Sequence, residues 1–375
     1  MTRILVLNTG SSSVKYRLFD GTETVAKGLV ERIGEPGGEA RDHETALQRI
    51  MDQIDLTGLA AVGHRVVHGG SEFTRATIID DTVVAAVARL VPLAPLHNPP
   101  ALSGIDVARK LLPDVPQVAV FDTAFHATIP PEGVTYAIDA ALAQRWGVRR
   151  YGFHGTSHAY VARRTAELLG VPVQQANVIT VHLGNGASAC AVQGGRSVAT
   201  SMGMSPQGGL VMGTRSGDID PAIVFHLHRV AGLSFDEVEN MLTRDAGMRG
   251  LTGENDMRVV EQRMEDGDPV ATLAIDVYCR RIREYVGAYL AVLGRVDAIS
   301  FTAGVGEHSP IVRGRTLAGL SALGIEVDTE RNERNAPVIS PDGAPVAVCV
   351  VPTDEELEIA EQTRATLAAS GAGRG

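Results

Sequence analysis

Residues 4–20 read ILVLNTGSSSVKYRLFD, and this segment gives the first indication of the fold. An apolar run, Ile4–Leu7, is followed by small residues at Thr9–Ser13 and then by an alternating stretch, Val14–Phe19. Two such runs joined by a short polar segment are typical of a β-hairpin. The segment therefore predicts strand, turn and strand. It lacks both the following helix and the G-x-x-x-x-G-K-[ST] pattern of a Walker loop.

The same pattern recurs in the second half of the chain. An apolar run, Val178–Leu183, meets Gly184–Gly186, and a further strand-like stretch, Ala187–Val192, follows. One hairpin in each half suggests a duplicated domain. A third glycine-rich segment, Ala303–Gly306, follows an apolar strand at Ala298–Thr302 and is interpreted as a turn, after which Pro310 is well placed to begin a helix.

Helical spacing of apolar residues predicts four helices between these hairpins. They are Pro100–Leu112, Ser157–Leu169, Phe235–Thr243 and Pro269–Leu293. The apolar stripe of the last one is compatible with buried core or with a subunit interface. A final helix is predicted at Asp354–Ala369, with Thr353 as N-cap and Glu356 completing a capping box. Because strands and helices alternate, the fold class is α/β.

The bulk composition restricts the class of protein. The 375 residues suggest two domains, with a boundary near residues 148–152. The net charge of −10 argues against a nucleic-acid backbone or an anionic membrane as partner. Three dispersed cysteines fit a reducing compartment. No apolar run has the ~18–20 residues of a membrane helix, and the N-terminal run is too short for a signal peptide. A cytoplasmic protein is expected.

Two charged residues are predicted at strand ends. In GHRVVHGG, residues 63–70, strand alternation turns Arg65 and Val67 the same way, which suits a short carboxylate with an alkyl tail. A structural salt bridge is the alternative for Arg65. Asp122 follows the apolar strand of PQVAVFD, at the end of a strand where α/β folds bind ligands, and a turn cap is its alternative.

Two further segments carry candidate phosphate-binding groups. His154 and His158 lie four residues apart at a predicted helix start, which favours contact with phosphate oxygens over a zinc pair. Arg215 lies in the glycine-rich loop of residues 209–221 and has Asp218 and Asp220 as alternative partners. The glycine turns can present backbone N–H groups to phosphates. Motifs of dinucleotide-binding folds, serine hydrolases and zinc proteases are absent from the sequence.

Nine segments taken together resemble the acetate kinase (acetokinase) family. They are NTGSSSVKY, GHRVVHGG, LAPLHNPP, FDTAFH, YGFHGTSH, HLGNGAS, MGTRSGDIDP, FTAGVGEH and PTDEELEIA. The resemblance implies two ribonuclease H-like (actin-like ATPase) domains flanking a nucleotide-binding cleft. The first would be residues 1–150 completed by a C-terminal helix at 355–375. The second would be residues 151–354, carrying most of the nucleotide site.

The resemblance also implies roles for individual residues, by their positions in these segments. The expected catalytic residues are Asp122, His154 and Arg215. The expected acetate-binding residues are Arg65, Val67, Leu96, Phe153 and Pro206. The expected metal-associated residues are Asn8 and Glu355. The expected ATP-binding residues are Ser13, Lys15, His182, Leu183, Gly184, Asn185, Gly186, Asp256, Met257, Arg258, Gly304, Val305, Gly306, Glu307 and His308. A favourable charge in the first helical turn is the alternative for Glu355.

The implied reaction is reversible, Mg²⁺-dependent phosphoryl transfer from ATP to acetate, giving acetyl phosphate and ADP, by direct in-line transfer in a homodimer. Mn²⁺ is an expected substitute for Mg²⁺. Acetate is ionised near pH 7 and needs no general base, so Asp122 is interpreted as an organiser of the metal rather than a proton acceptor. His308 departs from the family, which usually has Asn there. A propionate or butyrate kinase, a sugar kinase and an actin-like or chaperone ATPase are the competing hypotheses.

Overall fold

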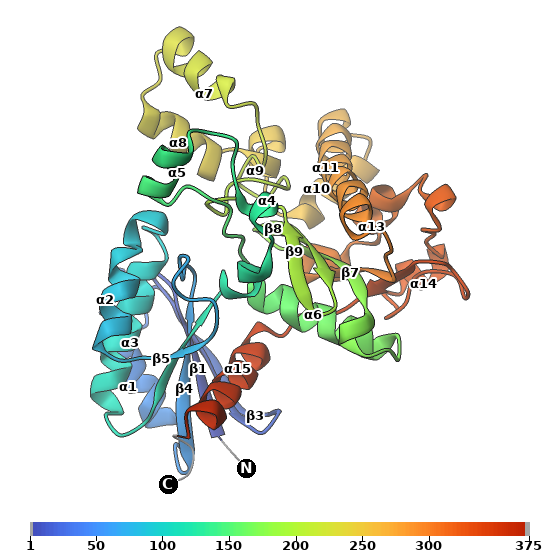
Figure 1. Ribbon diagram of the computed structural model, residues 1–375. Coiled ribbons are helices and arrows are strands. Elements are labelled where there is room, and N and C mark those ends of the chain that lie inside the picture. Colours follow the sequence, from blue (N-terminus) through green and yellow to red (C-terminus); the bar gives the residue numbers. More distant parts are fainter. Residues whose placement is uncertain (1–2, 372–375) are drawn as a thin grey trace. The chain divides into compact units, whose positions relative to one another are not determined.

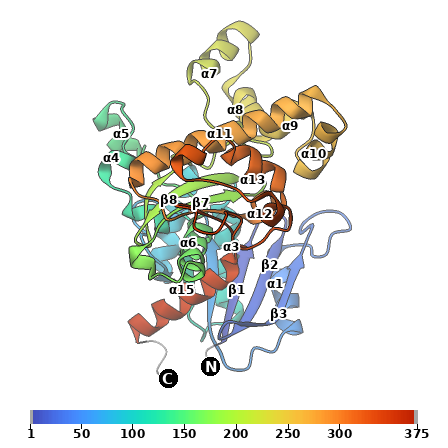
Figure 2. The same cartoon turned by 90° about the vertical axis from the view of Figure 1, so that its right-hand side faces the viewer.

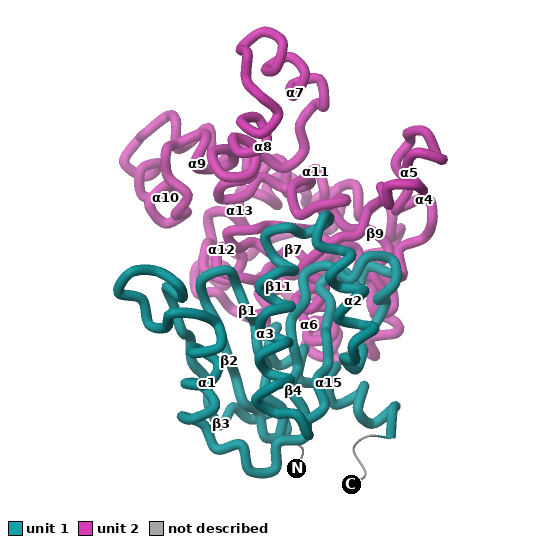
Figure 3. The backbone as a smooth tube through the Cα atoms, turned by 90° about the vertical axis from the view of Figure 1, so that its left-hand side faces the viewer, with its two compact units in different colours: residues 1–127, 354–375 teal, residues 128–353 magenta. Residues whose placement is uncertain are grey.

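The computed structural model describes residues 3–371, and these residues form two compact units. Unit 1 contains the N-terminal part of the chain to residue 127 together with the C-terminal segment from residue 354, and unit 2 contains residues 128–353 (Figure 3). Residues 1–2 and 372–375, which include the end of the expected C-terminal helix, lie outside the described part. Each unit is an α/β structure built on its own mixed sheet (Figure 1).

Unit 1 has a six-stranded sheet in the order β3-β2-β1-β4-β6-β5. Its strands are β1 (Arg3–Thr9), β2 (Val14–Asp20), β3 (Glu23–Val30), β4 (Leu59–Val66), β5 (Thr77–Ile78) and β6 (Gln117–Phe121). Its helices are α1 (His43–Gln53), α2 (Asp81–Arg89), α3 (Asn98–Leu111) and α15 (Glu355–Ser370), with short 3₁₀ turns η1 (Val91–Leu93) and η2 (Ala124–Thr128). The predicted hairpin is confirmed, since β1 and β2 pair antiparallel from Arg3–Asp20 to Thr9–Val14.

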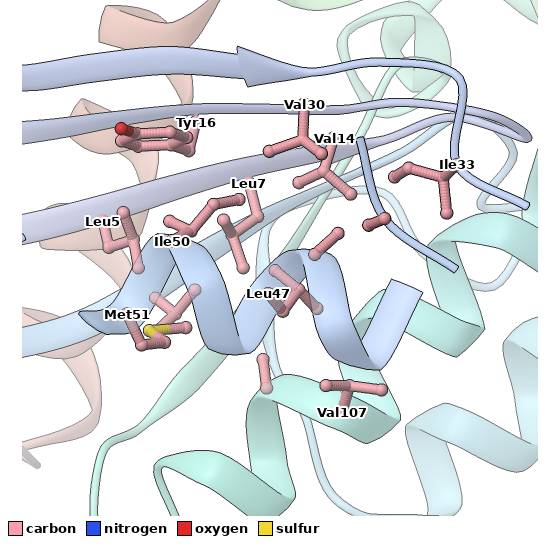
Figure 4. Packing of buried hydrophobic residues seen from close by; sticks show 14 of the residues in the cluster. Leu5, Leu7, Val14, Tyr16, Val30, Ile33, Leu47, Ile50, Met51 and Val107 are labelled. Atoms are coloured by element: carbon pink, nitrogen blue, oxygen red, sulfur yellow. The ribbon is translucent and has the colours of Figure 1, made fainter. Parts of the chain in front are cut away.

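Strand alternation divides the core of unit 1 between the two faces of its sheet. Leu5 and Leu7 of β1 pack with Leu47 and Ile50 of α1, as Figure 4 shows. The neighbouring residues Ile4 and Val6 belong to the other face, where they pack with Ile359 and Ala360 of α15. Successive side chains of a β-strand point to opposite faces of the sheet, which explains this division. The C-terminal helix therefore completes unit 1. In the chain, it is separated from the rest of that unit by residues 128–353, which form unit 2.

One glycine sets how closely α15 approaches the sheet. A Cβ on Gly63 of β4 would lie 2.5 Å from Oγ1 of Thr363 and 3.0 Å from the Ile359 side chain. A larger residue at position 63 would push α15 away from β4, because both contacts are shorter than a normal van der Waals approach. The first turn of α15 carries three acidic residues, including the predicted site residue Glu355.

Unit 2 has a five-stranded sheet in the order β11-β10-β7-β8-β9. Its strands are β7 (Asn177–Leu183), β8 (Ala187–Gln193), β9 (Arg196–Thr200), β10 (Ala298–Thr302) and β11 (Ala347–Val350). Its α-helices are α4 (Pro131–Val134), α5 (Ala140–Trp146), α6 (Gly155–Leu168), α7 (Ala222–His226), α8 (Phe235–Arg244), α9 (Gly247–Thr252), α10 (Met257–Glu265), α11 (Pro269–Leu293), α12 (Ala303–His308), α13 (Pro310–Leu317) and α14 (Thr329–Glu333). Short turns are η3 (Val173–Gln175), η4 (Leu227–Ala231) and η5 (Ser321–Leu323).

The two sheets repeat one topology, as the duplicated hairpins predict. In each, three antiparallel strands consecutive in the chain are followed, beside the first of them, by two parallel strands: β3-β2-β1-β4-β6 and β9-β8-β7-β10-β11. In unit 2, α6 packs against β7 and β10, while the long helix α11 packs against β7 and β8 (Figure 2). Most of the apolar stripe of α11 is buried there, including Tyr278, Ile282 and Val286, so the stripe is core.

Three expectations differ from the structure. Ala303–Gly306 is not a turn but the start of α12, which continues directly from β10. The N-cap of α15 is Asp354 rather than Thr353, and its carboxylate accepts the Leu357 N–H at 3.0 Å. The units divide at residue 127, upstream of residue 150. Arg150 belongs to unit 2, where it donates to the carbonyls of residues 200–202 at 2.8–3.0 Å.

Two further observations concern the class of protein. Cys190, Cys279 and Cys349 are buried and carry thiol side chains. Among residues 3–371, no helix combines the length and apolar character that crossing a bilayer requires.

Candidate functional site

In unit 1, two adjacent parallel strands bring Arg65 and Asp122 together. Arg65 is the penultimate residue of β4, and Asp122 directly follows β6, whose residues Val120 and Phe121 pair with Arg65 and Val66. Nε of Arg65 donates to Asp122 Oδ1 at 3.0 Å, and Nη2 donates to Oδ2 at 2.7 Å. This is the two-pronged geometry that guanidinium groups form with carboxylates. The salt bridge considered for Arg65 is present, and the partner of Asp122 is this arginine rather than a turn.

The charges around this pair keep the arginine protonated. Burial lowers the pKa of Arg65, but the carboxylates of Asp122, Glu355 and Glu356 outweigh that effect and raise the pKa above its usual value. Burial raises the pKa of Asp122, and the guanidinium opposes this shift. The Arg65 side chain retains 22% exposure, whereas Asp122 has 1%. Arg65 is thus a fixed positive charge that still reaches the surface of unit 1.

The first turn of α15 is anchored to the β1–β2 hairpin by two ion pairs. Lys15 Nζ lies 2.5 Å from Glu356 Oε1, and Arg17 Nη1 donates to both oxygens of Asp354 at 2.8 Å. These contacts place Glu355, which lies between the two acidic partners, close enough to influence Arg65 and Asp122 electrostatically. Lys15, predicted to bind ATP, is therefore already engaged by a carboxylate in this structure.

The other predicted residues of unit 1 lie on β1, in the β1–β2 hairpin, just beyond β4 and between η1 and α3. Asn8 is partly buried on β1 and pairs in register with Lys15. Ser13 is partly exposed in the hairpin turn, and Val67 is partly exposed just beyond β4. Leu96 is 63% exposed between η1 and α3.

In unit 2, a cluster of three histidines forms around the start of α6. His154 is the N-cap residue of α6 and has a left-handed backbone with φ of 56°. Its ring stacks on that of His182 with centroids 4.3 Å apart, and its Nδ1 lies 2.8 Å from Ser188 Oγ. His158 Nε2 contacts the same hydroxyl at 2.8 Å. The two histidines considered as a zinc pair thus share a serine, with ring centroids 6.5 Å apart.

Backbone hydrogen bonds fix the conformation of the loop that carries Arg215. The Met212 N–H bonds to the Arg215 carbonyl at 3.1 Å, and the Gly213 N–H bonds to the Asn185 carbonyl at 3.0 Å. Gly247 supports the loop with φ of 61°, and a Cβ there would lie 2.1 Å from the Met212 carbonyl oxygen. Only glycine fits this close backbone approach.

Arg215 does not pair with the acidic residues beside it in sequence. Its Nη1 donates to the Pro206 carbonyl at 2.8 Å, and burial lowers its pKa. Asp218 instead accepts the Gly209 N–H at 2.7 Å and the Tyr285 hydroxyl at 2.5 Å. The alternative of an Arg215–Asp218 pair is therefore wrong.

His154 and Arg215 meet at the β7–β8 hairpin turn. A Cβ built on Gly186 would lie 3.3 Å from His154 Nε2 and 3.6 Å from Arg215 Nη1. Residues 154, 186 and 215 are far apart in the sequence but converge here, with one side-chain nitrogen of His154 and one of Arg215 close to Gly186. Such an arrangement is suited to the oxygens of a phosphoryl group.

A cavity of about 560 Å³ opens beside the same turn. Its walls are Gly184, Asn185, Asn255, Asp256, Met257, Arg258, Glu261, Gly304, Val305, His308 and Ser309. Three separate segments expected to bind ATP thus line one cavity. Leu183 is fully buried and Gly306 is buried, so these two residues are not part of the wall. Glu307 accepts the Ala303 N–H at 2.8 Å and the Thr353 N–H at 3.3 Å, which stabilises the start of α12.

Three wall residues were not predicted from the sequence: Asn255, Glu261 and Ser309. Ser309 donates to Glu261, and burial raises the pKa of that carboxyl. No recognisable motif marks these positions, but Asn255 and Ser309 adjoin segments that were predicted. Phe153, expected at the alkyl end of acetate, is 2% exposed, and Pro206 contributes the carbonyl that holds Arg215.

A buried arginine holds the helix α12, which contributes residues to the cavity wall. Arg313 of α13 is fully buried, and it donates to the carbonyls of Gly306 and Glu307 at 2.9 and 3.0 Å. Its remaining donors bond to Asn332 and Asn335 at 2.6–2.8 Å. Burial lowers the pKa of this guanidinium to about 10. Arg313 therefore satisfies the C-terminal carbonyls of α12, whose N-terminal residues face the cavity.

Comparison with known proteins identifies the group to which the chain belongs. The model of the acetokinase family matches residues 3–361. An acetate kinase from Streptomyces avermitilis is 55% identical over 393 residues, covering 97% of each chain. The crystal structure of Porphyromonas gingivalis acetate kinase matches with a TM-score of 0.93 at 40% identity, covering 98% of this chain and 100% of that one. A propionate kinase from Francisella tularensis matches with a TM-score of 0.92 at 38% identity, covering 96% and 99%. The chain is therefore a member of the acetokinase family.

Proposed function

We propose that the protein is an acetate kinase, which transfers a phosphoryl group reversibly between ATP and acetate. The observation that carries the proposal is the convergence of His154 and Arg215 on Gly186, beside a cavity lined by Gly184, Asn185 and Gly304. The 55% identity to an acetate kinase over nearly the whole chain supports the same assignment. Within unit 1, the residues around Arg65 are proposed to bind the carboxylate, and within unit 2, the residues around the cavity are proposed to bind the nucleotide.

Arg65 is proposed to bind the carboxylate of acetate. Nε and Nη2 are used on Asp122, while no acceptor for Nη1 exists among residues 3–371. The pairing with Asp122 orients the guanidinium plane, and Nη1 remains to donate to a substrate anion. Val67, Leu96, Phe153 and Pro206 are proposed to surround the methyl group of acetate.

The oxygen donors of unit 1 are chemically suited to Mg²⁺. Asn8, Asp122 and Glu355 offer amide and carboxylate oxygens, and Mg²⁺ is usually held by one or two carboxylates, water and substrate phosphates. Both Asp122 oxygens bond to Arg65, so Asp122 is proposed to organise metal-bound water rather than to act as a base. When bound, Mg²⁺ or Mn²⁺ would neutralise charge on the phosphates. Among residues 3–371, no three His, Cys, Asp or Glu side chains gather into a metal site.

The reaction is proposed to be a direct in-line transfer. His154 and Arg215 donate to the oxygens of the moving phosphoryl group, and the residues around the cavity, with Ser13 and Lys15, hold the rest of the nucleotide. Phosphoryl transfer depends mainly on such positioning and charge stabilisation. Transfer from ATP chiral at the γ-phosphorus should therefore invert its configuration. Retention of configuration would indicate a phosphoenzyme and contradict the in-line route.

A product assay tests the function itself. The purified protein is incubated with ATP, Mg²⁺ and acetate, propionate or butyrate, and acyl phosphate is trapped with hydroxylamine. One methylene in an apolar pocket changes specificity by about 1–3 kcal/mol, so propionate should react at roughly 10–200-fold lower kcat/KM. A preference for propionate would instead favour the second candidate, a propionate kinase, which the Francisella tularensis structure supports. Turnover with a sugar panel and none with the acids would contradict both.

The proposed setting of the enzyme is cytoplasmic, as a homodimer without a nucleic-acid or membrane partner. The acidic net charge supports the absence of nucleic-acid binding. Sedimentation equilibrium measures the dimer directly, and a mass equal to one chain at micromolar concentration would contradict it.

A further inference from the structure

Asp218 closes the loop that carries Arg215. Its carboxylate oxygen Oδ1 accepts the N–H of Gly209 at 2.7 Å, and its own N–H donates to the Gly209 carbonyl at 3.0 Å. The Gly209–Asp218 pair thus formed joins the two ends of the segment that contains Arg215. Gly217 permits this close approach with φ of 68°, and a Cβ there would lie 2.4 Å from the Leu210 carbonyl oxygen. The two arms of the loop therefore lie side by side.

The placement of the Arg215 side chain depends on both arms. Nη1 of Arg215 donates at 2.8 Å to the carbonyl of Pro206, which precedes the first arm, whereas Arg215 itself lies on the second arm. The Gly209–Asp218 pair lies between this donor and this acceptor along the chain. It therefore helps to set the distance between them, and with it the position of the guanidinium.

Helix α11 holds Asp218 from its other side. The Tyr285 hydroxyl donates to Asp218 Oδ2 at 2.5 Å, and Arg281 donates to the carbonyls of Asp218 and Gly209 at 3.1 and 3.4 Å. Burial and the adjacent Asp218 carboxylate raise the pKa of Tyr285, so its hydroxyl keeps its proton and remains a donor. Because α11 packs against β7 and β8, the loop is connected to the sheet whose β7–β8 turn contains Gly186.

We infer that Asp218 is a positioning residue that places the Arg215 guanidinium beside Gly186. The inference rests on the proposed function, because the role of Arg215 in phosphoryl transfer is itself proposed. Each carboxylate oxygen of Asp218 accepts a hydrogen bond, one from Gly209 and one from Tyr285, so Asp218 contributes hydrogen bonds rather than charge. An asparagine can form the same bonds, since its amide oxygen accepts an N–H and its amide nitrogen donates to a hydroxyl.

Hydrogen–deuterium exchange measures the Gly209–Asp218 pair without any substrate. In Asp218→Ala, the Gly209 amide loses its charged acceptor, so amides of residues 206–218 should exchange roughly tenfold faster than in the wild-type protein. In Asp218→Asn, exchange of this segment should stay close to the wild-type rate. Wild-type exchange of the segment in a folded D218A protein would overturn the inference.

Two further variants complete this experiment. Glu284→Ala is the matched control, because Glu284 and Asp218 line the same surface hollow of about 410 Å³ but Glu284 pairs with Arg280 and Arg281. E284A should leave both the exchange of residues 206–218 and kcat unchanged. Asp218 is 49% exposed, so D218A is expected to fold. Should it not fold, Tyr285→Phe removes only the hydroxyl that holds Oδ2 and should change exchange and kcat in the same direction.

A double-mutant cycle tests whether Asp218 acts through Arg215. D218A should lower kcat by roughly ten- to hundredfold with little change in KM for ATP, since misplacing a catalytic group costs rate rather than nucleotide binding. D218N should retain most of kcat. In the Arg215→Ala background, D218A should change kcat by less than about twofold, because the group that Asp218 positions is gone. Equal losses in both backgrounds would overturn the inference, because general damage lowers kcat with or without Arg215.

Failure of this inference is distinguishable from failure of the proposed function. A wild-type protein that forms no acyl phosphate would contradict the proposed function, while the exchange experiment would still report on the Gly209–Asp218 pair. An active wild-type enzyme whose D218A variant keeps normal exchange or normal kcat would overturn the positioning role of Asp218 alone.

Discussion

Replacing Gly186 with alanine should abolish most catalysis while leaving the fold and nucleotide binding in place. The added methyl would lie 3.3 Å from His154 Nε2 and 3.6 Å from Arg215 Nη1, in the space proposed for the phosphoryl oxygens. Gly186 does not have the positive φ that would exclude alanine. The nearest atoms are the ends of two side chains rather than backbone, so the chain can accommodate the methyl by small shifts.

The expected loss of rate follows from the distance by which the added methyl group displaces a phosphoryl oxygen. A phosphoryl oxygen cannot share the volume of a methyl group, so it must move by roughly 1 Å or more, and such misplacement costs on the order of 10²-fold in rate. The melting temperature should change by less than about 2–4 °C, since the expected cost in stability is below 1 kcal/mol. Gly186 is not part of the cavity wall, so ADP affinity should stay within a few-fold.

Coupled-enzyme kinetics in both directions, together with calorimetric titration of ADP, measure these effects. Gly287→Ala is the matched control, because a Cβ there meets nothing within 4 Å and the position lies on the exposed side of α11. It should leave kcat unchanged. A G186A enzyme that keeps near-normal kcat while binding ADP normally would show that the phosphoryl group does not pass between His154 and Arg215.

Three further predictions follow from single contacts. Arg215→Ala should lower kcat by roughly 10²–10⁴-fold, as expected for an arginine that stabilises the transferring phosphoryl group, and near-normal steady-state turnover would exclude that role. His64 is buried with a pKa of about 4 against an ordinary 6.5, so the folded state resists its protonation and stability falls as pH drops below 6.5. Between pH 7.5 and 5 the loss should be about 2 kcal/mol in urea unfolding, and His64→Asn should show a correspondingly shallower decline; an equal slope in the variant would refute this. Arg313→Lys should destabilise the protein by at least about 2 kcal/mol because buried carbonyls lose their donors, whereas Arg315→Lys, at an exposed ion pair, should change stability by less than about 1 kcal/mol.

Local patterns in the sequence were sufficient to predict most helices and strands of the fold. The β1–β2 and β7–β8 hairpins, helix α11 from Pro269 to Leu293 and the placement of Asp122 after a strand all depend on residues close in the chain. Two expectations about local structure were wrong. Ala303–Gly306 is helical because Glu307 binds the first N–H of α12 and buried Arg313 binds its last carbonyls. Asp354 displaces Thr353 as N-cap because Arg17, over 300 residues away, holds its carboxylate.

The sequence by itself determined which residue types are available for binding carboxylate and phosphate, because those types lie in short segments that can be recognised in isolation. Tertiary structure alone decided their partners. It joined Arg65 to Asp122 across two parallel strands, and it brought His154, Gly186 and Arg215 to one turn. It also linked His154 to His158 through Ser188. Hydrogen bonds and ion pairs act over about 3 Å in space, and separation along the chain carries no information about such distances until the chain has folded.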